Sequence, residues 1–381
     1  MYQGENRKIV LIGTGMVGMS YAYALLNQNV CDELVLIDID KKRAMGEAMD
    51  LNHGLAFSGS NMKISAGDYP DCANADIVCI CAGVAQKPGE SRTDLLLRNA
   101  QVFRSIVNPV TESGFNGLFL VATNPVDIMT RITCTLSGFN PRRVIGTGTT
   151  LDTARLRYLL GRHFGVDPRN MHAYVMGEHG DSEFVPWSLA MMASRPVLEL
   201  CGQQSGITDR ESDGKKAEAT DGQDVGKEAE AVKKGSFGKA NGSITVNEKE
   251  AYGSGRSETG NGSNRSGQIS CRLKDLLAIE DEVRNAAYRI IEAKDATYYG
   301  IGMAMTRITR AIFGNENSVL TVSAMLRGEY GQNRVFTGVP AIIGSNGIAR
   351  VLDLPMNAEE QKKLDESCEK LKSYYEEMRL E

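Results

Sequence analysis

His179 lies in a stretch of the chain that suits neither a helix interior nor a strand. The sequence VMGEHGDSEF, residues 175–184, places it between two glycines and flanks it with acids, and the chain has only 4 histidines. An imidazole in such a loop can give or take a proton near neutral pH. Reduction of a carbonyl group, for example, needs a proton donor for the forming alkoxide, a cation that polarises the carbonyl, and a clamp for any carboxylate that the substrate carries. His179 is the predicted donor.

A carboxylate held against the other ring nitrogen would keep His179 protonated and fix its ring. Glu178 and Asp181 are near in the sequence, but close neighbours in a chain rarely place their side chains correctly for this contact. We therefore expect a distant partner and choose Asp152, which stands at a predicted helix start in LDTARLR. Arg155 follows on the same helical face, and its planar guanidinium suits a substrate carboxylate.

A second arginine, Arg92, lies in AGVAQKPGESRTDLLLRN, where Gly83, Pro88 and Gly89 mark a loop between a strand and a helix. Closure of this loop would carry Arg92 onto the substrate carbonyl and exclude water, which strengthens the polar contacts inside. Taken singly, each candidate also has an ordinary structural explanation. Histidines are often structural, aspartates at helix starts usually cap them, and helix arginines usually face solvent.

A candidate cofactor-binding motif lies near the start of the chain, where Gly13, Gly15 and Gly18 form the pattern G-x-G-x-x-G. It follows the apolar run KIVLI and opens a helical pattern, which is the context that the dinucleotide fingerprint requires. Gly13 permits the tight turn, Gly15 lets the backbone approach a pyrophosphate at the helix N-terminus, and Gly18 allows close packing of helix and strand. A tight turn without a ligand is the alternative interpretation.

Asp38, about twenty residues further on in ELVLID, decides between the two dinucleotides. Its carboxylate can accept hydrogen bonds from an adenosine ribose diol and repels a 2′-phosphate, so the predicted cofactor is NAD. Three basic residues nearby could instead bind the 2′-phosphate of NADP, but Asp38 is expected to lie nearer to the ribose. They are Lys41, Lys42 and Arg43.

These residues need a scaffold of alternating strands and helices. Before position 150 the predicted buried strands are KIVLIG, ELVLID, ADIVCICAG, GLFLVATNP and RVIGTGT, with a weaker one at MKISAG. Helical patterns lie between them, which predicts a doubly wound parallel α/β sheet of the Rossmann type in residues 1–149. Beyond it the alternation loosens, and helical patterns at TARLRYLLGRHF, VRNAAYRIIEAK and the C-terminal end predict a second, α+β catalytic domain over residues 150–381.

Residues from about 201 to 270 differ in kind. They are rich in Gly, Ser, Asn, Lys and Glu and have very few large apolar side chains, so they cannot bury enough surface to offset their conformational entropy. We predict a largely disordered insertion in a surface loop, with partner binding as the alternative.

Composition excludes several classes of protein. The chain has 381 residues, 42% of them hydrophobic, and a formal net charge of -5, which gives no general attraction to nucleic acid or anionic membranes. No signal peptide or membrane-spanning stretch is recognisable, so a cytoplasmic protein is expected. The 8 cysteines are scattered, and the one close pair, Cys79 and Cys81, is interpreted as buried reduced thiols. No metal site is predicted.

The chain closely resembles the lactate/malate dehydrogenase family, and within it the bacterial type of L-lactate dehydrogenase. The resemblance rests on the motifs GTGMVG, LIDID, AMDLNHG, CAGVAQKPGESRTDLL, TNPVD, LDTARLR, GEHGDSEFVPWS and KDATYYGIG, and spans almost all of the chain except the insertion. It implies that His179 is the proton donor and acceptor, Asp152 its partner, Arg155 the carboxylate clamp and Arg92 the arginine of the mobile loop.

The resemblance also implies the remaining contacts. Asn124 in TNPVD matches a residue that touches substrate and nicotinamide, while Thr297 and Ile301 match positions that line the pocket and the nicotinamide. We expect further cofactor contacts from three residues of the turn and loop, namely Met16, Val17 and Gly83.

Gln86 carries the substrate choice. The malate enzymes of the family place an arginine at this position, and a neutral amide leaves a second carboxylate unpaired in a closed site. Pyruvate is therefore the expected substrate, with glycolysis and fermentation as the context. Because Lys87 is adjacent, a malate dehydrogenase or an enzyme for bulkier 2-keto acids stays open as an alternative, and a non-catalytic NAD-binding scaffold is a remote one.

Arg157 and His172 match positions through which bacterial family members bind fructose 1,6-bisphosphate across a subunit interface. Two such cations from each of two facing subunits would hold two phosphates. An allosteric homo-oligomer, a tetramer, is thus expected, although an ordinary surface arginine and histidine explain the two residues equally well.

Overall fold

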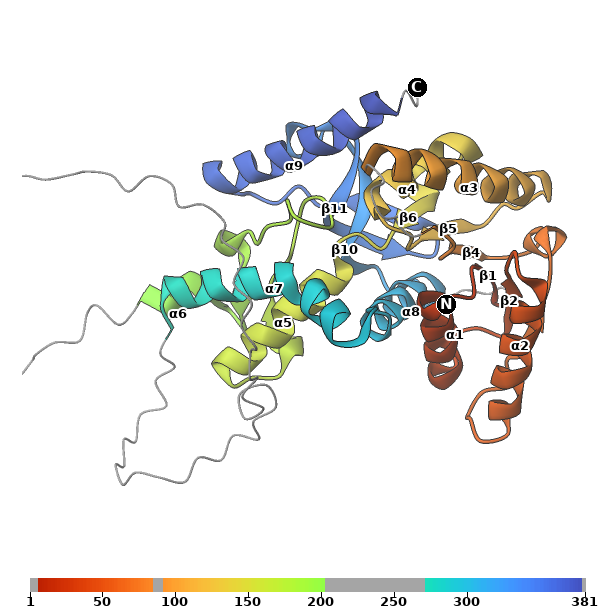
Figure 1. Ribbon diagram of the computed structural model, residues 1–381. Helices are drawn as coiled ribbons and strands as arrows, with labels where there is room; N and C mark the ends of the chain where they lie inside the picture. The colour runs from red at the N-terminus through yellow and green to blue at the C-terminus, as the bar shows by residue number, and fades with distance from the viewer. Residues whose placement is uncertain (1–5, 85–91, 203–270, 379–381) are drawn as a thin grey trace, which may run out of the picture. The chain divides into compact units, whose positions relative to one another are not determined.

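The computed structural model describes residues 6–84, 92–202 and 271–378, and its central feature is a nine-stranded sheet (Figure 1). Six strands pair in parallel in the order β3-β2-β1-β4-β5-β6, which confirms the doubly wound parallel sheet predicted for the first half. These strands are β1 (Lys8–Ile12), β2 (Glu33–Ile37), β3 (Lys63–Ala66), β4 (Ile77–Ile80), β5 (Leu118–Val121) and β6 (Val144–Gly146). All five expected strands and the weaker sixth are therefore confirmed.

Three strands from the second half extend the same sheet in antiparallel order, which the sequence did not predict. They are β10 (Ser318–Arg327), β11 (Asn333–Gly344) and β12 (Gly347–Val351). The junction is short, because β10 meets β6 through the pairing of Ser323 with Gly146. A small separate sheet holds β7 (Met171–His172), β8 (Met191–Met192) and β9 (Arg195–Pro196). The second half is thus α+β, as expected.

Helices cover both faces of the sheet. In Figure 1, α3, α4 and α9 lie on one side of it, and α1 and α8 lie on the other. The helices of the first half are α1 (Met16–Gln28), α2 (Lys41–Leu55), α3 (Arg92–Glu112) and α4 (Val126–Ser137). Those of the second half are α5 (Thr150–Phe164), α6 (Val197–Gly202), α7 (Leu273–Lys294), α8 (Tyr299–Phe313) and α9 (Ala358–Glu377). The capping box expected at the last helix is present, between Asn357 and Glu360.

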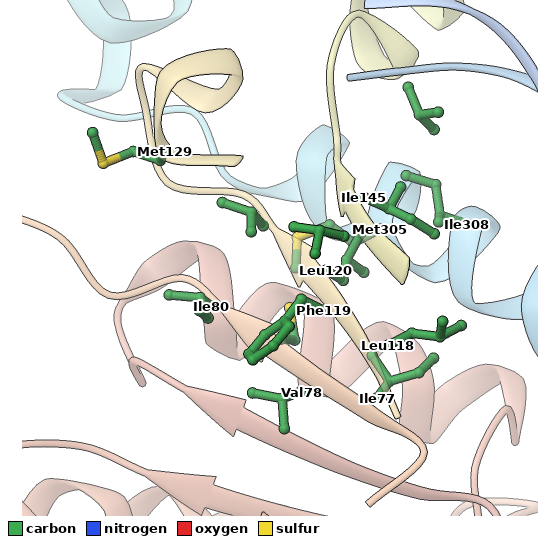
Figure 2. Packing of buried hydrophobic residues seen from close by; sticks show 14 of the residues in the cluster. Ile77, Val78, Ile80, Leu118, Phe119, Leu120, Met129, Ile145, Met305 and Ile308 are labelled. Carbon is green, nitrogen blue, oxygen red and sulfur yellow. The ribbon is translucent and has the colours of Figure 1, made fainter. Parts of the chain in front are cut away.

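The main hydrophobic core fills the space between the parallel strands and these helices. Figure 2 shows it around β4 and β5, whose side chains are buried on both faces, with Met305 and Ile308 of α8 packed among them. Burial on both faces explains why these strands read as unbroken apolar runs in the sequence. The core thus contains residues from both halves of the chain.

Helix α8 joins the two halves because it packs along α1 (Figure 1). A Cβ on Gly302 would lie 2.8 Å from the backbone carbon of Ser20, so only glycine permits this approach. The buried hydroxyl groups of Tyr21 and Thr309 share a hydrogen bond of 2.6 Å across the contact. Helix α1 is therefore held in place by α8 of the catalytic half.

The cysteines are only partly as expected. Cys79 and Cys81 are free, with sulfur atoms 3.9 Å apart; Cys79 is buried, as predicted, but Cys81 is half-buried. Cys201 and Cys271, however, form a disulfide that was not predicted. The predicted insertion itself lies outside the described residues, apart from the two residues at its N-terminal end that belong to α6.

The predicted boundary between the two domains at residue 149 stays a prediction. Within residues 6–84, 92–202 and 271–378, no helix combines the length and the apolar character needed to cross a bilayer.

Candidate active site

The glycine turn between β1 and α1 has the shape that a pyrophosphate requires. Gly13 has φ +101°, and a Cβ there would lie 2.5 Å from the backbone nitrogen of Ala82. A Cβ on Gly18 would collide with the carbonyl oxygen of Gly13, whereas no atom lies within 4 Å of the position of a Cβ on Gly15. Gly15 is the N-cap of α1 and provides no side-chain cap, so no capping side chain competes with a ligand for the first N–H groups of the helix. The roles assigned to the three glycines agree with this geometry.

Asp38 follows β2 directly and faces the same turn. Its carboxylate accepts hydrogen bonds from the backbone N–H and the hydroxyl of Thr14, at 2.7 and 2.9 Å, and from the N–H of Asp40 at 3.0 Å. Burial raises the pKa of Asp38, but hydrogen bonds from Asp40 and Thr14 outweigh it and hold the pKa below its usual value. An ionised carboxylate in this place suits a ribose diol and opposes a 2′-phosphate. One nearby cation, Lys41, is paired with Asp68 at 2.6 Å. The residues thus fit NAD better than NADP.

His179 and Asp152 are in contact although they are 27 positions apart in the sequence. Nδ1 of His179 lies 2.6 Å from Oδ2 of Asp152, a hydrogen-bond distance, and the other oxygen of Asp152 lies 2.7 Å from Nη1 of Arg155. The Asp152 side chain is 1% exposed and that of His179 is 25% exposed. The spatial relation expected of these three residues is therefore present.

The loop that bears His179 is fixed from several sides. Gly177 exchanges two backbone hydrogen bonds with Gly338 of β11, at 3.0 and 2.9 Å. Gly177 and Gly180 have φ +96° and +144°, which side-chain-bearing residues rarely adopt, so the two glycines that flank the histidine are required by the backbone. The N–H of His179 donates to Oδ2 of Asp127 at 2.9 Å. These contacts hold the imidazole against α5.

The charges around His179 favour its protonated form. Burial lowers the pKa of His179, but Asp152, followed by Glu183 and Asp127, outweighs it and raises the pKa to about 9. Burial likewise raises the pKa of Asp152, yet His179 and Arg155 bring it below its usual value. At neutral pH the pair is thus an imidazolium and a carboxylate, ready to give a proton from Nε2.

Other predicted residues lie at the ends of elements that converge here. Asn124 is exposed three residues after the end of β5, in a cis peptide bond with Pro125, and Ile301 is half-buried in the first turn of α8. A Cβ on Gly300 would lie 2.9 Å from Cδ1 of Leu151, which places the start of α8 against the start of α5. Thr297, half-buried between α7 and α8, is close by in the chain.

The remaining predicted positions are less fully described. Gln86 and Lys87 lie outside the described residues, and Arg92 is described only as the first residue of α3. Gly83 is exposed after β4, and a Cβ there would lie 2.5 Å from Cγ2 of Thr123. Met16 and Val17 begin α1, next to the glycine turn.

Sequence reasoning missed two buried acids beside His179. Asp127 is 1% exposed and accepts hydrogen bonds from the N–H of His179 and the hydroxyl of Ser323. Burial raises the pKa of Asp127 to about 6, against the lowering effect of those two hydrogen bonds. Glu183 is 5% exposed, and its Oε2 lies 3.8 Å from Nδ1 of His179. The one sequence signal that pointed to them is that Asp127 lies in the motif TNPVD and Glu183 in GEHGDSEF, next to predicted site residues.

One oxygen each from Asp152 and Glu183 and a ring nitrogen of His179 lie within 4.8 Å of one another, a spacing also found around metal ions. The 2.6 Å contact between His179 and Asp152 is that of a direct hydrogen bond, which leaves no space for an ion between them.

The comparisons with known proteins agree with this geometry. Residues 7–146 match the lactate/malate dehydrogenase NAD-binding domain, and residues 149–225 and 260–380 match the lactate/malate dehydrogenase alpha/beta C-terminal domain. The gap between the last two ranges falls inside the predicted insertion.

Individual relatives are similar over nearly their whole length. An L-lactate dehydrogenase of Oceanobacillus iheyensis is 44% identical over 374 residues, 98% of this chain and 96% of that protein. One of Geobacillus stearothermophilus is 45% identical over 373 residues, 98% of each chain. A crystal structure of the minor L-lactate dehydrogenase of Enterococcus mundtii superposes with a TM-score of 0.80 at 40% identity, covering 99% of both chains. The chain belongs to the lactate/malate dehydrogenase family.

Proposed function

We propose that this protein is an NAD-dependent L-lactate dehydrogenase that interconverts pyruvate and L-lactate. The observation that carries the proposal is the buried contact of 2.6 Å between His179 and Asp152, in a chain whose glycine turn and Asp38 fit NAD. The relatives named above, which carry the name L-lactate dehydrogenase, support it. A cytoplasmic enzyme of glycolysis and fermentation is the corresponding physiological proposal.

His179 supplies the proton in this proposal, while bound NADH supplies the hydride. Because Nδ1 of His179 is held by Asp152, Nε2 is the nitrogen that gives its proton to the forming alkoxide. Asp152 fixes the tautomer and stabilises the imidazolium, and it stays ionised itself. In lactate oxidation the neutral imidazole accepts the proton of the hydroxyl group, so the same pair serves both directions.

Arg155 is the proposed clamp for the substrate carboxylate. Its side chain is 14% exposed, and its Nη1 is paired with Asp152. A guanidinium has five N–H donors, so contact with Asp152 at one nitrogen leaves others for the substrate and also fixes the plane of the group. We assign the polarisation of the carbonyl to Arg92, contacts with substrate to Asn124 and Thr297, and contacts with the nicotinamide to Asn124 and Ile301.

Gln86 is the proposed selector of pyruvate over oxaloacetate, for the charge reason given above. The test is steady-state oxidation of NADH with pyruvate, oxaloacetate and a branched 2-keto acid under the same conditions. The proposal expects the highest kcat/KM for pyruvate. A preference for oxaloacetate would favour the malate dehydrogenase alternative, and no turnover with any of the three would favour the non-catalytic scaffold.

Regulation by fructose 1,6-bisphosphate is a second part of the proposal. Arg157 of α5 donates from Nε to the carbonyl oxygen of Ala173 at 3.1 Å, which brings it beside the exposed His172 of β7. An arginine and an imidazole close together can both donate hydrogen bonds to a phosphate group. Added fructose 1,6-bisphosphate is expected to raise activity at low pyruvate and to stabilise the oligomer; the absence of both effects would refute this part.

A homotetramer is the proposed assembly. Met45 and Met49, one turn apart on α2, have exposed fractions of 57% and 58%, and Leu273 and Leu277 on α7 have fractions of 58% and 52%. Rows of exposed apolar side chains on two helices support a surface covered by a second copy. Light scattering on the purified protein is expected to give four times the chain mass, and the mass of a single chain would refute this assembly.

A further inference from the structure

We propose that Glu183 is a positioning residue for proton transfer, because its buried carboxyl group stabilises the imidazolium of His179 from the side of the nitrogen that Asp152 holds. The inference rests on the proposed function and deepens it, since it adds a third member to the group that controls the proton. Glu183 touches neither the reacting proton on Nε2 nor the substrate; it acts through His179.

The backbone turns Glu183 back toward the histidine. Its N–H donates to the carbonyl oxygen of Gly180 at 3.1 Å, which closes a turn, and the next residue, Phe184, exchanges two backbone hydrogen bonds with Met176 at 2.9 and 3.0 Å. The loop is therefore closed at its base, with His179 near its tip. This closure explains how a residue four positions after His179 can face its ring.

Both carboxyl groups near Nδ1 of His179 are removed from water. Oδ2 of Asp152 lies at 2.6 Å and Oε2 of Glu183 at 3.8 Å, and the two side chains are 1% and 5% exposed. The first distance is a hydrogen bond, whereas the second is an electrostatic contact without one. Because water is largely excluded, a charge at 3.8 Å acts strongly on the ring.

Charged groups from two helices face Glu183 in addition to the histidine. From α5 come Asp152 and Arg155, and from α7 comes Arg284, whose Nη2 donates to the backbone carbonyl of Glu183 at 3.3 Å. Arg284 also lies 3.3 Å from Glu280, which accepts a hydrogen bond from Trp187 at 2.8 Å. Asp127 of α4 faces the histidine rather than Glu183. Cations and acids thus nearly balance around the carboxyl group.

The protons of Glu183 and His179 are coupled by this arrangement. Burial and the charge of Asp152 raise the pKa of Glu183 to about 8, although His179, Arg155 and Arg284 act in the opposite direction. The pKa of His179 is about 9. Because opposite charges stabilise each other, the ionised form of Glu183 opposes loss of the imidazolium proton of His179. The donor form of His179 therefore persists further into the alkaline range than Asp152 alone would allow.

Glu178 provides a matched control. It is also a buried glutamate, adjacent to His179 in the sequence, but its carboxylate lies 2.7 Å from Nζ of Lys370 on α9 and 2.5 Å from the hydroxyl of Ser182. The same substitution at this position removes a buried acid of the same loop without removing the group that faces the imidazole. Comparing the two variants therefore separates the effect of losing any buried acid in this loop from the effect of losing the contact between Glu183 and His179.

The test is an NMR pH titration of the ring carbons of the 4 histidines in the protein without substrate or cofactor, with His179→Asn to assign the signal. In Glu183→Gln we expect the His179 midpoint to move to lower pH by about one unit. Glu178→Gln is expected to leave that midpoint at the wild-type value, and Glu183→Asp to give an intermediate one. The alkaline limb of kcat/KM for pyruvate should move by the same amount as the midpoint in each variant.

A folded Glu183→Gln protein with the wild-type midpoint would overturn the proposal. If that variant does not fold, the same comparison with Glu183→Asp decides, because a midpoint equal to that of the wild type contradicts the coupling. The titration needs no turnover, so a protein that is inactive with pyruvate but shows the shift refutes the proposed function and leaves the role of Glu183 intact.

Discussion

Cys201 and Cys271 are joined by a disulfide, with Cα atoms 4.3 Å apart, although 70 positions separate them in the sequence. One cysteine lies in the last turn of α6 and the other comes just before α7. The chain therefore leaves the described part of the structure and returns to it at one point. This relation explains how an insertion in the catalytic half can leave the elements around His179 in place.

Replacing residues 203–269 by a short glycine-serine linker is expected to preserve turnover. The Cα atoms of Cys201 and Cys271, which lie just outside the deleted segment, are 4.3 Å apart, a span that a few residues can close. The check is kcat and KM for pyruvate in the deletion variant beside the full chain. A variant that folds and binds NADH but has lost activity would show that the insertion takes part in catalysis.

The disulfide itself is expected to stabilise the oxidised protein. Closing a loop of this length reduces the conformational entropy of the unfolded chain, which raises the free energy of unfolding by about 4 kcal/mol if the effect is purely entropic. Reductant should lower the Tm of the wild type and leave that of the double variant Cys201→Ser, Cys271→Ser unchanged. Equal Tm values for the wild type with and without reductant would contradict the prediction.

Gly18→Ala is expected to weaken NADH binding and to destabilise the fold by about 1–3 kcal/mol, because its Cβ would collide with the carbonyl oxygen of Gly13. Gly46→Ala is the control, since its Cβ would meet no atom within 4 Å on the exposed face of α2. The control should bind NADH normally and gain up to about 1 kcal/mol of stability. NADH fluorescence titrations and thermal unfolding measure both effects, and normal binding by Gly18→Ala would be the contrary outcome.

Gln86→Arg is expected to shift the preference toward oxaloacetate. The introduced guanidinium can pair with the second carboxylate of that substrate, which a neutral amide leaves uncompensated. The ratio of kcat/KM for oxaloacetate and pyruvate should rise at least about tenfold. Lys87→Gln serves as a control for the neighbouring charge, and an unchanged ratio in Gln86→Arg would speak against the assignment.

The parallel half of the sheet was predictable because its strands are buried on both faces. Val10, Leu36 and Ile80 belong to unbroken apolar runs, a local signal that needs no knowledge of the partner strand. The antiparallel strands were missed because their own residues obscure the pattern. Gly338 and Pro340 lie inside β11. Because both residue types are uncommon inside strands, the sequence did not indicate a strand there.

In the site, too, some features could be predicted from the sequence and others could not. The pairing of Asp152 with His179 could be predicted because the chemistry demands a carboxylate and the motifs have a known order. Asp127 and Glu183 lie in two of the same motifs, but their burial could not be predicted, because an isolated acid in a sequence is expected to face water and only tertiary packing decides that it is buried. Burial of a charged group is thus the property that local sequence reports least well.

Asp152 keeps His179 protonated, and the pH dependence of kcat/KM for pyruvate measures this effect in the working enzyme. The pKa of His179 is raised to about 9, so the protonated donor is present below that pH and activity falls as pH rises through it. Asp152→Asn removes the charge that raises this pKa, and at neutral pH the loss is expected to be about a hundredfold. We expect the alkaline limb of the wild type near pH 9 and that of Asp152→Asn at clearly lower pH. The same limb in both proteins, with equal rates at neutral pH, would contradict it.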